Sequence, residues 1–310
     1  MTRYKLSFEC ISPIFIGGTE ELSYLNIFFN NKNDQRAMLK IFPELTPPNI
    51  QERLLPYLTF PNSLQLHQIY ESLISEEPKL PVKTIADSTD FELKERYEKN
   101  ITSINIKLMP SRNDSPYVPG SSLKGMFKTP FIKEEPRPYN LDGSAKDFNN
   151  DPFRLVRFTD SLNEKLKLHA GNIEVKNFST RNPNSIPGYF QYLAPGSTFE
   201  SEITDMGDKI DFNQVSLFYL YAYKKNKEQI YRQDIDMKDF CNSFETRLMS
   251  MNNNQFIASL GGMGGAWTKV IGDTFKFNSE KFYRTSKSSF RKSNHFKQPM
   301  GWIIGTYERL

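Results

Sequence analysis

The segment Pro116-Tyr-Val-Pro-Gly-Ser-Ser-Leu-Lys-Gly-Met-Phe-Lys128 constrains the folding of this chain more than any other. Pro119 fixes one φ angle and favours an extended conformation for Val118, while Gly120 permits a sharp turn. One of the two serines that follow accepts hydrogen bonds from the backbone N–H groups that open a helix. The segment therefore predicts a strand end, a tight turn and a helix N-terminus.

This corner also has the features of a phosphate site. The N-terminus of a helix presents N–H groups and the positive end of its dipole, which favour anions. Lys124 and Lys128 are spaced i, i+4, so they lie on one helical face. An ordinary capped helix with solvated lysines is the alternative, since serines are common at such caps. The candidate phosphate contacts are Gly120, Ser121, Ser122, Lys124 and Lys128.

The segment Ser12-Pro-Ile-Phe-Ile-Gly-Gly-Thr19 interrupts a predicted first strand, Tyr4–Cys10. Residues of that strand alternate between apolar and polar, which is the period of a half-buried strand. The pair Gly17-Gly18 permits positive φ angles and close approach of another backbone. We therefore predict a turn or loop that exposes its backbone to a ligand or to solvent.

Apolar and basic residues are interleaved in the segment Asp151-Pro-Phe-Arg-Leu-Val-Arg-Phe-Thr-Asp-Ser161. Arg154 and Arg157 are available for phosphate contacts, because the apolar residues take the core-facing positions. The predicted core-facing residues are Phe153, Leu155 and Phe158.

Five glycines fall within Gly261–Gly272, which predicts a loop lined by backbone. A dinucleotide fingerprint is disfavoured, because Trp267 occupies the position where a third glycine or alanine allows close packing of helix on strand. Too few residues follow to build further βαβ units. A cluster of tight turns with Trp267 in the core remains an alternative to a ligand-binding loop.

Four segments resemble, in order, the motifs of the RAMP superfamily, the repeat-associated RNA-binding subunits of CRISPR effector complexes. The segment at 116–128 resembles the signature Pro-Gly-Ser-Ser-Leu-Lys-Gly, and the one at 11–19 resembles the Pro-x-x-Ile-Gly loop that touches guide RNA. The stretch Leu193–Ile203 matches a Pro-Gly-x-x-Phe strand of the same proteins. The four segments are Ile11–Thr19, Tyr117–Lys128, Asp151–Ser161 and Gly261–Lys269.

The resemblance implies an α+β fold with an RRM-like (ferredoxin-like) core, helical insertions and a related or degenerate C-terminal lobe. It also implies that loop amides and nearby cations hold an RNA backbone. The predicted RNA-binding residues are Gly17, Gly18, Gly120, Ser121, Ser122, Lys124, Lys128, Arg154, Arg157, Gly262, Gly264, Gly265, Trp267 and Lys269.

Composition divides the chain into three parts. Residues 1–42 and 101–205 are assigned to the core, with predicted strands at 22–29, 36–42 and 101–109. Prolines cluster between 43 and 100 around helix-like pieces at Ser63–Ile74 and 88–97, which predicts a helical insertion. The segment 134–150 is predicted to be a mobile surface loop or a second insertion. Residues 206–310 form the predicted C-terminal lobe, with helices at 215–223 and 237–251 and a last strand at 300–307.

The net charge of +4 is small, but it is unevenly distributed. The segment Lys269–Lys297 carries a net charge of +6, which leaves −2 for the rest of the chain. Cys10 and Cys241 are the only cysteines, too few for a disulfide framework or a thiolate metal cluster. The longest apolar run, Val215–Tyr223, is too short to span a bilayer. We therefore expect a cytoplasmic protein with no membrane partner.

Catalytic motifs are not apparent in the sequence. His67, His169 and His295 are scattered, and no zinc-protease, nucleophile-elbow or phosphate-loop motif is present. RAMP subunits that cut target RNA use an aspartate in the loop after the first strand, whereas this chain has Glu20 and Glu21 there. We predict a protein with no catalytic residue, no metal and no cofactor.

Together with the ending Pro299–Ile303, the four segments are most similar to the type III-A (Csm) RAMP subunit that caps the effector filament at the 3′ end of the guide RNA. The resemblance implies a non-catalytic subunit that supports guide-RNA maturation in antiviral defence. Its implied partners are the 3′ region of the guide RNA, other Csm-type subunits (especially the backbone and small subunits) and, indirectly, target RNA. A backbone RAMP subunit that cleaves target RNA and a stand-alone endoribonuclease that processes guide RNA remain alternatives.

Overall fold

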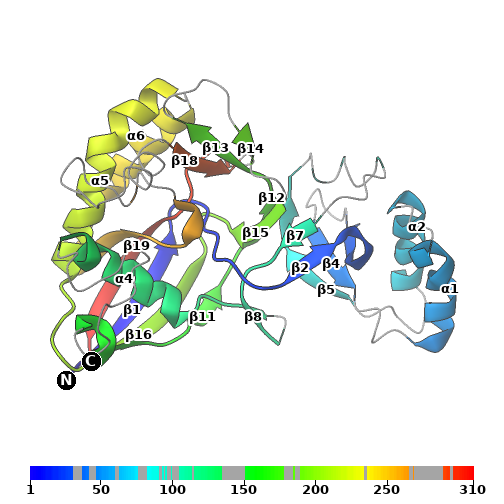
Figure 1. Ribbon diagram of the computed structural model, residues 1–310, viewed down its shortest axis with the longest axis horizontal. Coiled ribbons are helices and arrows are strands. Elements are labelled where there is room, and N and C mark those ends of the chain that lie inside the picture. Colours follow the sequence, from blue (N-terminus) through cyan, green and yellow to red (C-terminus); the bar gives the residue numbers. More distant parts are fainter. Residues whose placement is uncertain are drawn as a thin grey trace.

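The fold is α+β, as predicted, with several sheets and three long helices in its main body (Figure 1). The computed structural model describes residues 1–30, 37–41, 47–59, 63–75, 82–90, 93, 95, 99, 105–113, 115–134, 151–177, 184–185, 189–233, 236–264, 268, 289–293 and 296–310. No helix within these ranges is long and apolar enough to cross a membrane.

The central sheet joins strands from both ends of the chain. Neighbouring strands are antiparallel throughout, and β11 (Leu162–Lys165) also pairs with β16. The strand order is β10 (Val156–Phe158), β16 (Thr198–Asp205), β1 (Thr2–Cys10), β19 (Trp302–Arg309) and β17 (Gln255–Ser259).

One face of this sheet is covered by helices. Along β1, Leu6 and Phe8 are buried while Ser7 between them is exposed, the alternation that predicted a half-buried strand. The covering helices contribute Phe127 and Phe212 to the same core, whose rings lie 5.8 Å apart. The helices of this body are α4 (Gly120–Glu134), α5 (Phe212–Gln233) and α6 (Asp236–Met249).

Smaller sheets extend from the main body. One follows the order β2 (Glu21–Ser23), β7 (Asn105–Lys107), β15 (Tyr189–Leu193), β12 (Leu168–Gly171) and β6 (Ser88–Thr89). Another follows β14 (Asn184–Ser185), β13 (Ile173–Asn177) and β18 (Ser289–Ser293), and β8 (Ser111–Arg112) pairs with β9 (Ser115–Pro116). The short 3-10 helices are η1 (Tyr24–Asn26), η5 (Pro152–Leu155) and η6 (Gly262–Gly264).

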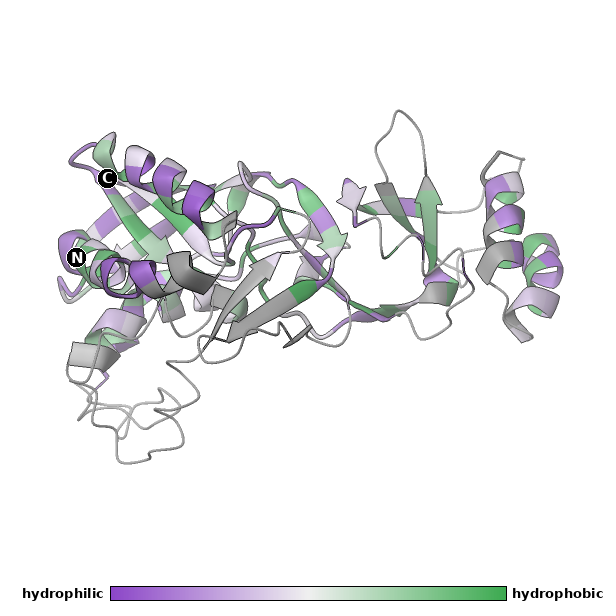
Figure 2. Ribbon diagram, turned by 90° about the horizontal axis from the view of Figure 1, so that it is seen from above, coloured by the Kyte–Doolittle hydropathy of each residue, from purple (hydrophilic) through white to green (hydrophobic). Residues whose placement is uncertain are grey.

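A separate lobe lies at the end of the molecule away from both chain termini (Figures 1 and 2). It has its own apolar cluster, in which Leu66 and Tyr70 are fully buried. Its elements are β3 (Ile27–Asn30), β4 (Ala37–Ile41), β5 (Val82–Ala86), α1 (Pro48–Thr59) and α2 (Ser63–Ser75). Helix α2 confirms the predicted helix at 63–74.

Three local predictions differ from the structure. Ser88–Thr89 form strand β6 rather than the start of a helix, because they pair with His169 and Ala170 of β12. Residues 22–29 form two strands separated by η1 rather than one. Leu155 is 37% exposed rather than core-facing, because residues 152–155 form a 3-10 helix without the alternation of a strand. The predicted loop at 135–150 lies outside the described residues.

The division of the chain into core, insertion and C-terminal lobe remains a prediction. Strand pairing runs across its boundary at residue 205, since β19 and β17 belong to the same sheet as β1 and β16.

Candidate nucleic-acid interface

The predicted corner forms at the start of helix α4. The backbone of Val118 exchanges hydrogen bonds with Ser161, whose Oγ accepts at 2.8 Å and whose N–H donates at 2.9 Å. A Cβ on Gly120 would lie 2.4 Å from the carbonyl oxygen of Phe158. Gly120 is therefore required by the close approach of two backbones.

Asp160 occupies the anion position at this helix N-terminus. Its Oδ1 accepts the N–H of Gly120 at 2.9 Å, and its Oδ2 pairs with the guanidinium of Arg112 at 2.7 Å. The same guanidinium lies 5.3 Å from the centre of the Tyr117 ring. The helix N-terminus thus binds an anion, as its dipole favours, but the anion here is a carboxylate of the chain itself.

The two candidate lysines of α4 contact the segment that follows the predicted loop. The Lys124 ammonium donates to the carbonyl oxygen of Val156 at 2.9 Å, and burial lowers its pKa. Lys128 forms an ion pair of 2.9 Å with Asp151, and both side chains are mostly buried. Asp151 also accepts the N–H of Phe153 and so begins η5. An RNA phosphate at these lysines has to displace or join these internal partners.

The serines and arginines of the candidate set are more accessible. Ser121 is exposed and Ser122 is half-buried at the start of α4. Arg154 in η5 and Arg157 in β10 are both exposed.

The two glycines of the first loop have different environments. Gly17 is exposed, and a Cβ there would meet only the Phe15 ring, at 3.7 Å. Gly18 donates to the carbonyl oxygen of Leu108 at 3.0 Å, and a Cβ there would lie 2.8 Å from that oxygen. Gly18 is therefore needed for packing, whereas Gly17 presents backbone at the surface.

The glycine-rich segment lies against the first loop (Figure 1). Gly261 has a positive φ of 87°, and a Cβ there would lie 2.2 Å from the carbonyl oxygen of Phe15. Gly262 is exposed, and a Cβ there would meet no atom within 4 Å. Gly264 ends η6, whereas Gly265, Trp267 and Lys269 lie outside the described residues.

These contacts bring the candidate segments together in two pairs. The first loop joins the glycine-rich segment through Phe15 and Gly261, and the α4 corner joins the segment at 151–161. Both pairs rest on one apolar cluster, which contains Val118, Leu123 and Leu260. Asp160 could not be predicted from the sequence as the group at the helix N-terminus, since it lies 40 residues from Gly120.

A buried serine–histidine–aspartate chain lies away from these segments. Ser88 Oγ is 2.7 Å from His169 Nδ1, and His169 Nε2 is 2.9 Å from Asp90 Oδ1. This order matches a nucleophile, a base and an orienting acid. His169 is fully buried, however, and the rings of Tyr192 and Phe296 pack against it. We interpret the chain as a structural link between β6 and β12.

The acidic residues of the first loop face cations. Glu20 pairs with Lys40, and Glu21 lies 3.5 Å from Lys107. Within the described residues, no group of three or more His, Cys, Asp or Glu side chains is placed to hold a metal ion.

The class of protein with this antiparallel sheet, helical layer and paired loops follows from comparison with known protein families. The model of the RAMP superfamily matches residues 7–269. The chain therefore belongs to the RAMP superfamily, as its motifs predicted.

Individual proteins and solved structures show which members of the superfamily the chain resembles. The chain is 24% identical over 302 residues to the CRISPR system Cms protein Csm5 of Streptococcus thermophilus, with 86% of this chain and 80% of that protein covered. Its fold resembles a chain of the Csm–crRNA–target RNA ternary complex of a type III-A CRISPR–Cas system, solved by cryo-electron microscopy, with a TM-score of 0.63, 18% identity and coverage of 99% and 100%. It also resembles the crystal structure of T. onnurineus Csm5, with a TM-score of 0.57, 15% identity and coverage of 96% and 99%. These similarities confirm the predicted resemblance to Csm-type RAMP subunits.

Proposed function

We propose that this chain is a non-catalytic guide-RNA-binding subunit of a type III-A effector complex that caps the filament at the 3′ end of the guide RNA. The observation that carries the proposal is the contact of Phe15 with Gly261, which joins the first loop to the glycine-rich segment, and each of these segments has an exposed glycine, Gly17 and Gly262 respectively. Exposed backbone without side chains suits a nucleic-acid backbone. The similarity to Csm-type subunits supports the same role.

We further propose that the central sheet is the RRM-like core. In a βαββαβ unit the sheet order is 2-3-1-4, and β10, β16, β1 and β19 have this order here. Helix α4 lies between β1 and β10 in sequence, and α5 lies between β16 and β19. Strand β17 is then an added edge strand.

We also propose that the chain has no catalytic activity and that it acts in the cytoplasm with the other subunits of the complex. The burial of His169 and the cationic partners of Glu20 and Glu21 support a non-catalytic role. The expected partners are the other Csm-type subunits, especially the backbone and small subunits, with target RNA as an indirect partner in the cytoplasm.

The proposal is tested by Gly262→Glu in the full chain. Because a Cβ at 262 would meet no atom within 4 Å and the position is exposed, we expect the variant to add a negative charge without distorting the loop. We expect affinity for a single-stranded, guide-like RNA to fall by about tenfold, equivalent to about 1.4 kcal/mol. Fluorescence anisotropy measures this at several salt concentrations, and the affinity of the natural sequence should fall steeply as salt rises.

Asn49→Glu is the matched control, since Asn49 is exposed on α1 in the lobe at the far end of the molecule (Figure 1). It adds the same charge and should leave RNA affinity unchanged. Equal affinities for all three proteins, or equal losses in both variants, would contradict RNA binding at the paired loops.

A further inference from the structure

A polar groove lies on the face of the central sheet that the helices leave open. We propose that this groove receives an arginine side chain from a neighbouring protein subunit, so that protein binds this face and RNA binds the paired loops. The inference rests on the proposed function, because it takes the neighbour to be another subunit of the same complex.

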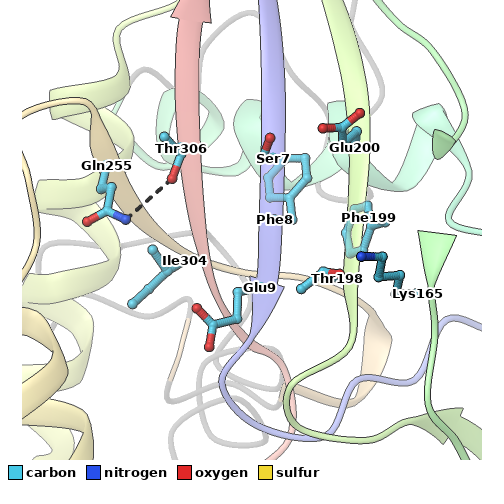
Figure 3. Close-up of a pocket in the computed structure, with 10 residues that line it drawn as sticks. All are labelled: Ser7, Phe8, Glu9, Lys165, Thr198, Phe199, Glu200, Gln255, Ile304 and Thr306. Carbon is cyan, nitrogen blue, oxygen red and sulfur yellow. Dashed lines mark hydrogen bonds between the residues drawn. The ribbon is translucent and has the colours of Figure 1, made fainter. Parts of the chain in front are cut away.

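The groove has a volume of about 370 Å³ and crosses five strands (Figure 3). Its floor is formed by alternate residues of adjacent strands, since Ser7 lies opposite Glu200 on β16 and opposite Thr306 on β19. The lining side chains on the open face are Ser7, Glu9, Lys165, Thr198, Glu200, Gln255, Ile304 and Thr306.

The lining groups favour a cationic donor. The carboxylates of Glu9 and Glu200 line the groove together with the ammonium of Lys165, and each carboxylate is also paired with a cation beside the groove, Arg247 or Lys5. Ser7, Thr198 and Thr306 add hydroxyl oxygens that accept hydrogen bonds. A guanidinium has five N–H donors in a planar fork, which satisfies several separate acceptors at once, whereas an ammonium acts as a single point charge.

The carboxylates have exposed partners that a neighbour's side chain can replace. Glu200 pairs with Lys5 at 2.9 Å, and Glu9 pairs with Arg247. The side chain of Lys5 is 42% exposed and that of Arg247 is 47% exposed. Exposed pairs of this kind contribute little to stability, so exchange for an intermolecular pair costs little.

RNA is a poor match for the same face. An RRM-type sheet binds bases by stacking them on aromatic side chains of its central strands. Phe8 and Phe199 border the groove, but only 2% and 1% of their surfaces are exposed, and their rings stack on each other 4.9 Å apart in the core. The open-face residues of β1 and β16 are Arg3, Lys5, Ser7, Glu9, Thr198, Glu200, Glu202 and Thr204. None of these is aromatic, so the two strands offer no ring on which a base could stack.

Glu200→Arg tests the inference in the full chain, coexpressed with the other subunits and the guide RNA. The variant places a guanidinium where the neighbour's is expected, and like charges at such a contact weaken assembly by about tenfold or more. Native mass spectrometry of the purified complex measures the fraction that carries this chain. RNA affinity of the isolated chain and its melting midpoint should stay unchanged. Glu228→Arg, at an exposed position on α5, is the control and should assemble normally.

A second measurement needs no variant. Carbodiimide labelling of carboxylates in the natural chain, free and in the complex, is read by mass spectrometry. We expect Glu9 and Glu200 to be protected in the complex, also after nuclease treatment, while the exposed Glu52 of α1 stays reactive. Unchanged labelling of Glu9 and Glu200, normal assembly of folded Glu200→Arg, or protection lost with the RNA would each overturn the inference. If the natural chain neither binds RNA nor joins the complex, the proposed function fails instead.

Discussion

Gly120 and Gly125 belong to the same helix, yet one is confined by a neighbouring backbone and the other has open space around it. The sequence predicted the turn at Gly120, because Pro119 restricts the backbone and the glycine after it permits a sharp turn. It could not predict the partners that make the corner rigid. Asp160 and Asp151 lie 40 and 23 residues from the groups that they bind, and local patterns carry no information about such pairs.

Gly120→Ala should lower the free energy of unfolding by about 2 kcal/mol, because its Cβ would overlap the Phe158 carbonyl oxygen and neither backbone can move away freely. Gly125→Ala, in the same helix with no atom within 4 Å of its Cβ, should raise the free energy of unfolding by about 0.5–1 kcal/mol. Urea denaturation measures both. Equal effects of the two substitutions would show that Gly120 does not approach the Phe158 carbonyl as closely as described.

Most long elements could be predicted from their periodicity. The first strand, α2, α5, α6 and the last strand all lie where apolar residues recur at strand or helix spacing. Strand β6 could not be predicted, because two residues have no period and their conformation depends on pairing with β12. The same holds for the buried link between these strands, in which His169 lies 81 residues from Ser88 and 79 residues from Asp90.

Asp90→Ala should lower the free energy of unfolding by about 3 kcal/mol, since it leaves buried polar groups of His169 and Asn172 without their acceptor. Asp87→Ala is the control, because Asp87 accepts the N–H of Leu168 at an exposed position, and its loss should cost about 1 kcal/mol or less. Urea denaturation measures the free energy of unfolding of both variants. If the two variants lose equal stability, the chain through His169 does not link the strands as described.

For the whole molecule, the sequence predicted strands near both chain ends but not that they are neighbours. The alternation of apolar and polar residues shows which side of a strand is buried, but it does not show which strand lies next to it. The pairing of β1 with β19 is therefore known only from the structure. The family motifs carried the functional prediction. Three-dimensional packing then distinguishes Gly17 and Gly262, which present backbone at the surface, from Gly18 and Gly120, which are held in close contacts.

Photocrosslinking can show whether RNA runs along the paired loops, as we propose. Guide RNA carrying 4-thiouridine in its 3′ region is assembled into the complex, irradiated, and analysed by mass spectrometry for RNA-linked peptides. We expect crosslinks to the first loop, residues 11–19, and to the segment at 260–264. Crosslinks to the open sheet face, at residues 3–9 or 198–204, with none at the two loops, would contradict the proposal.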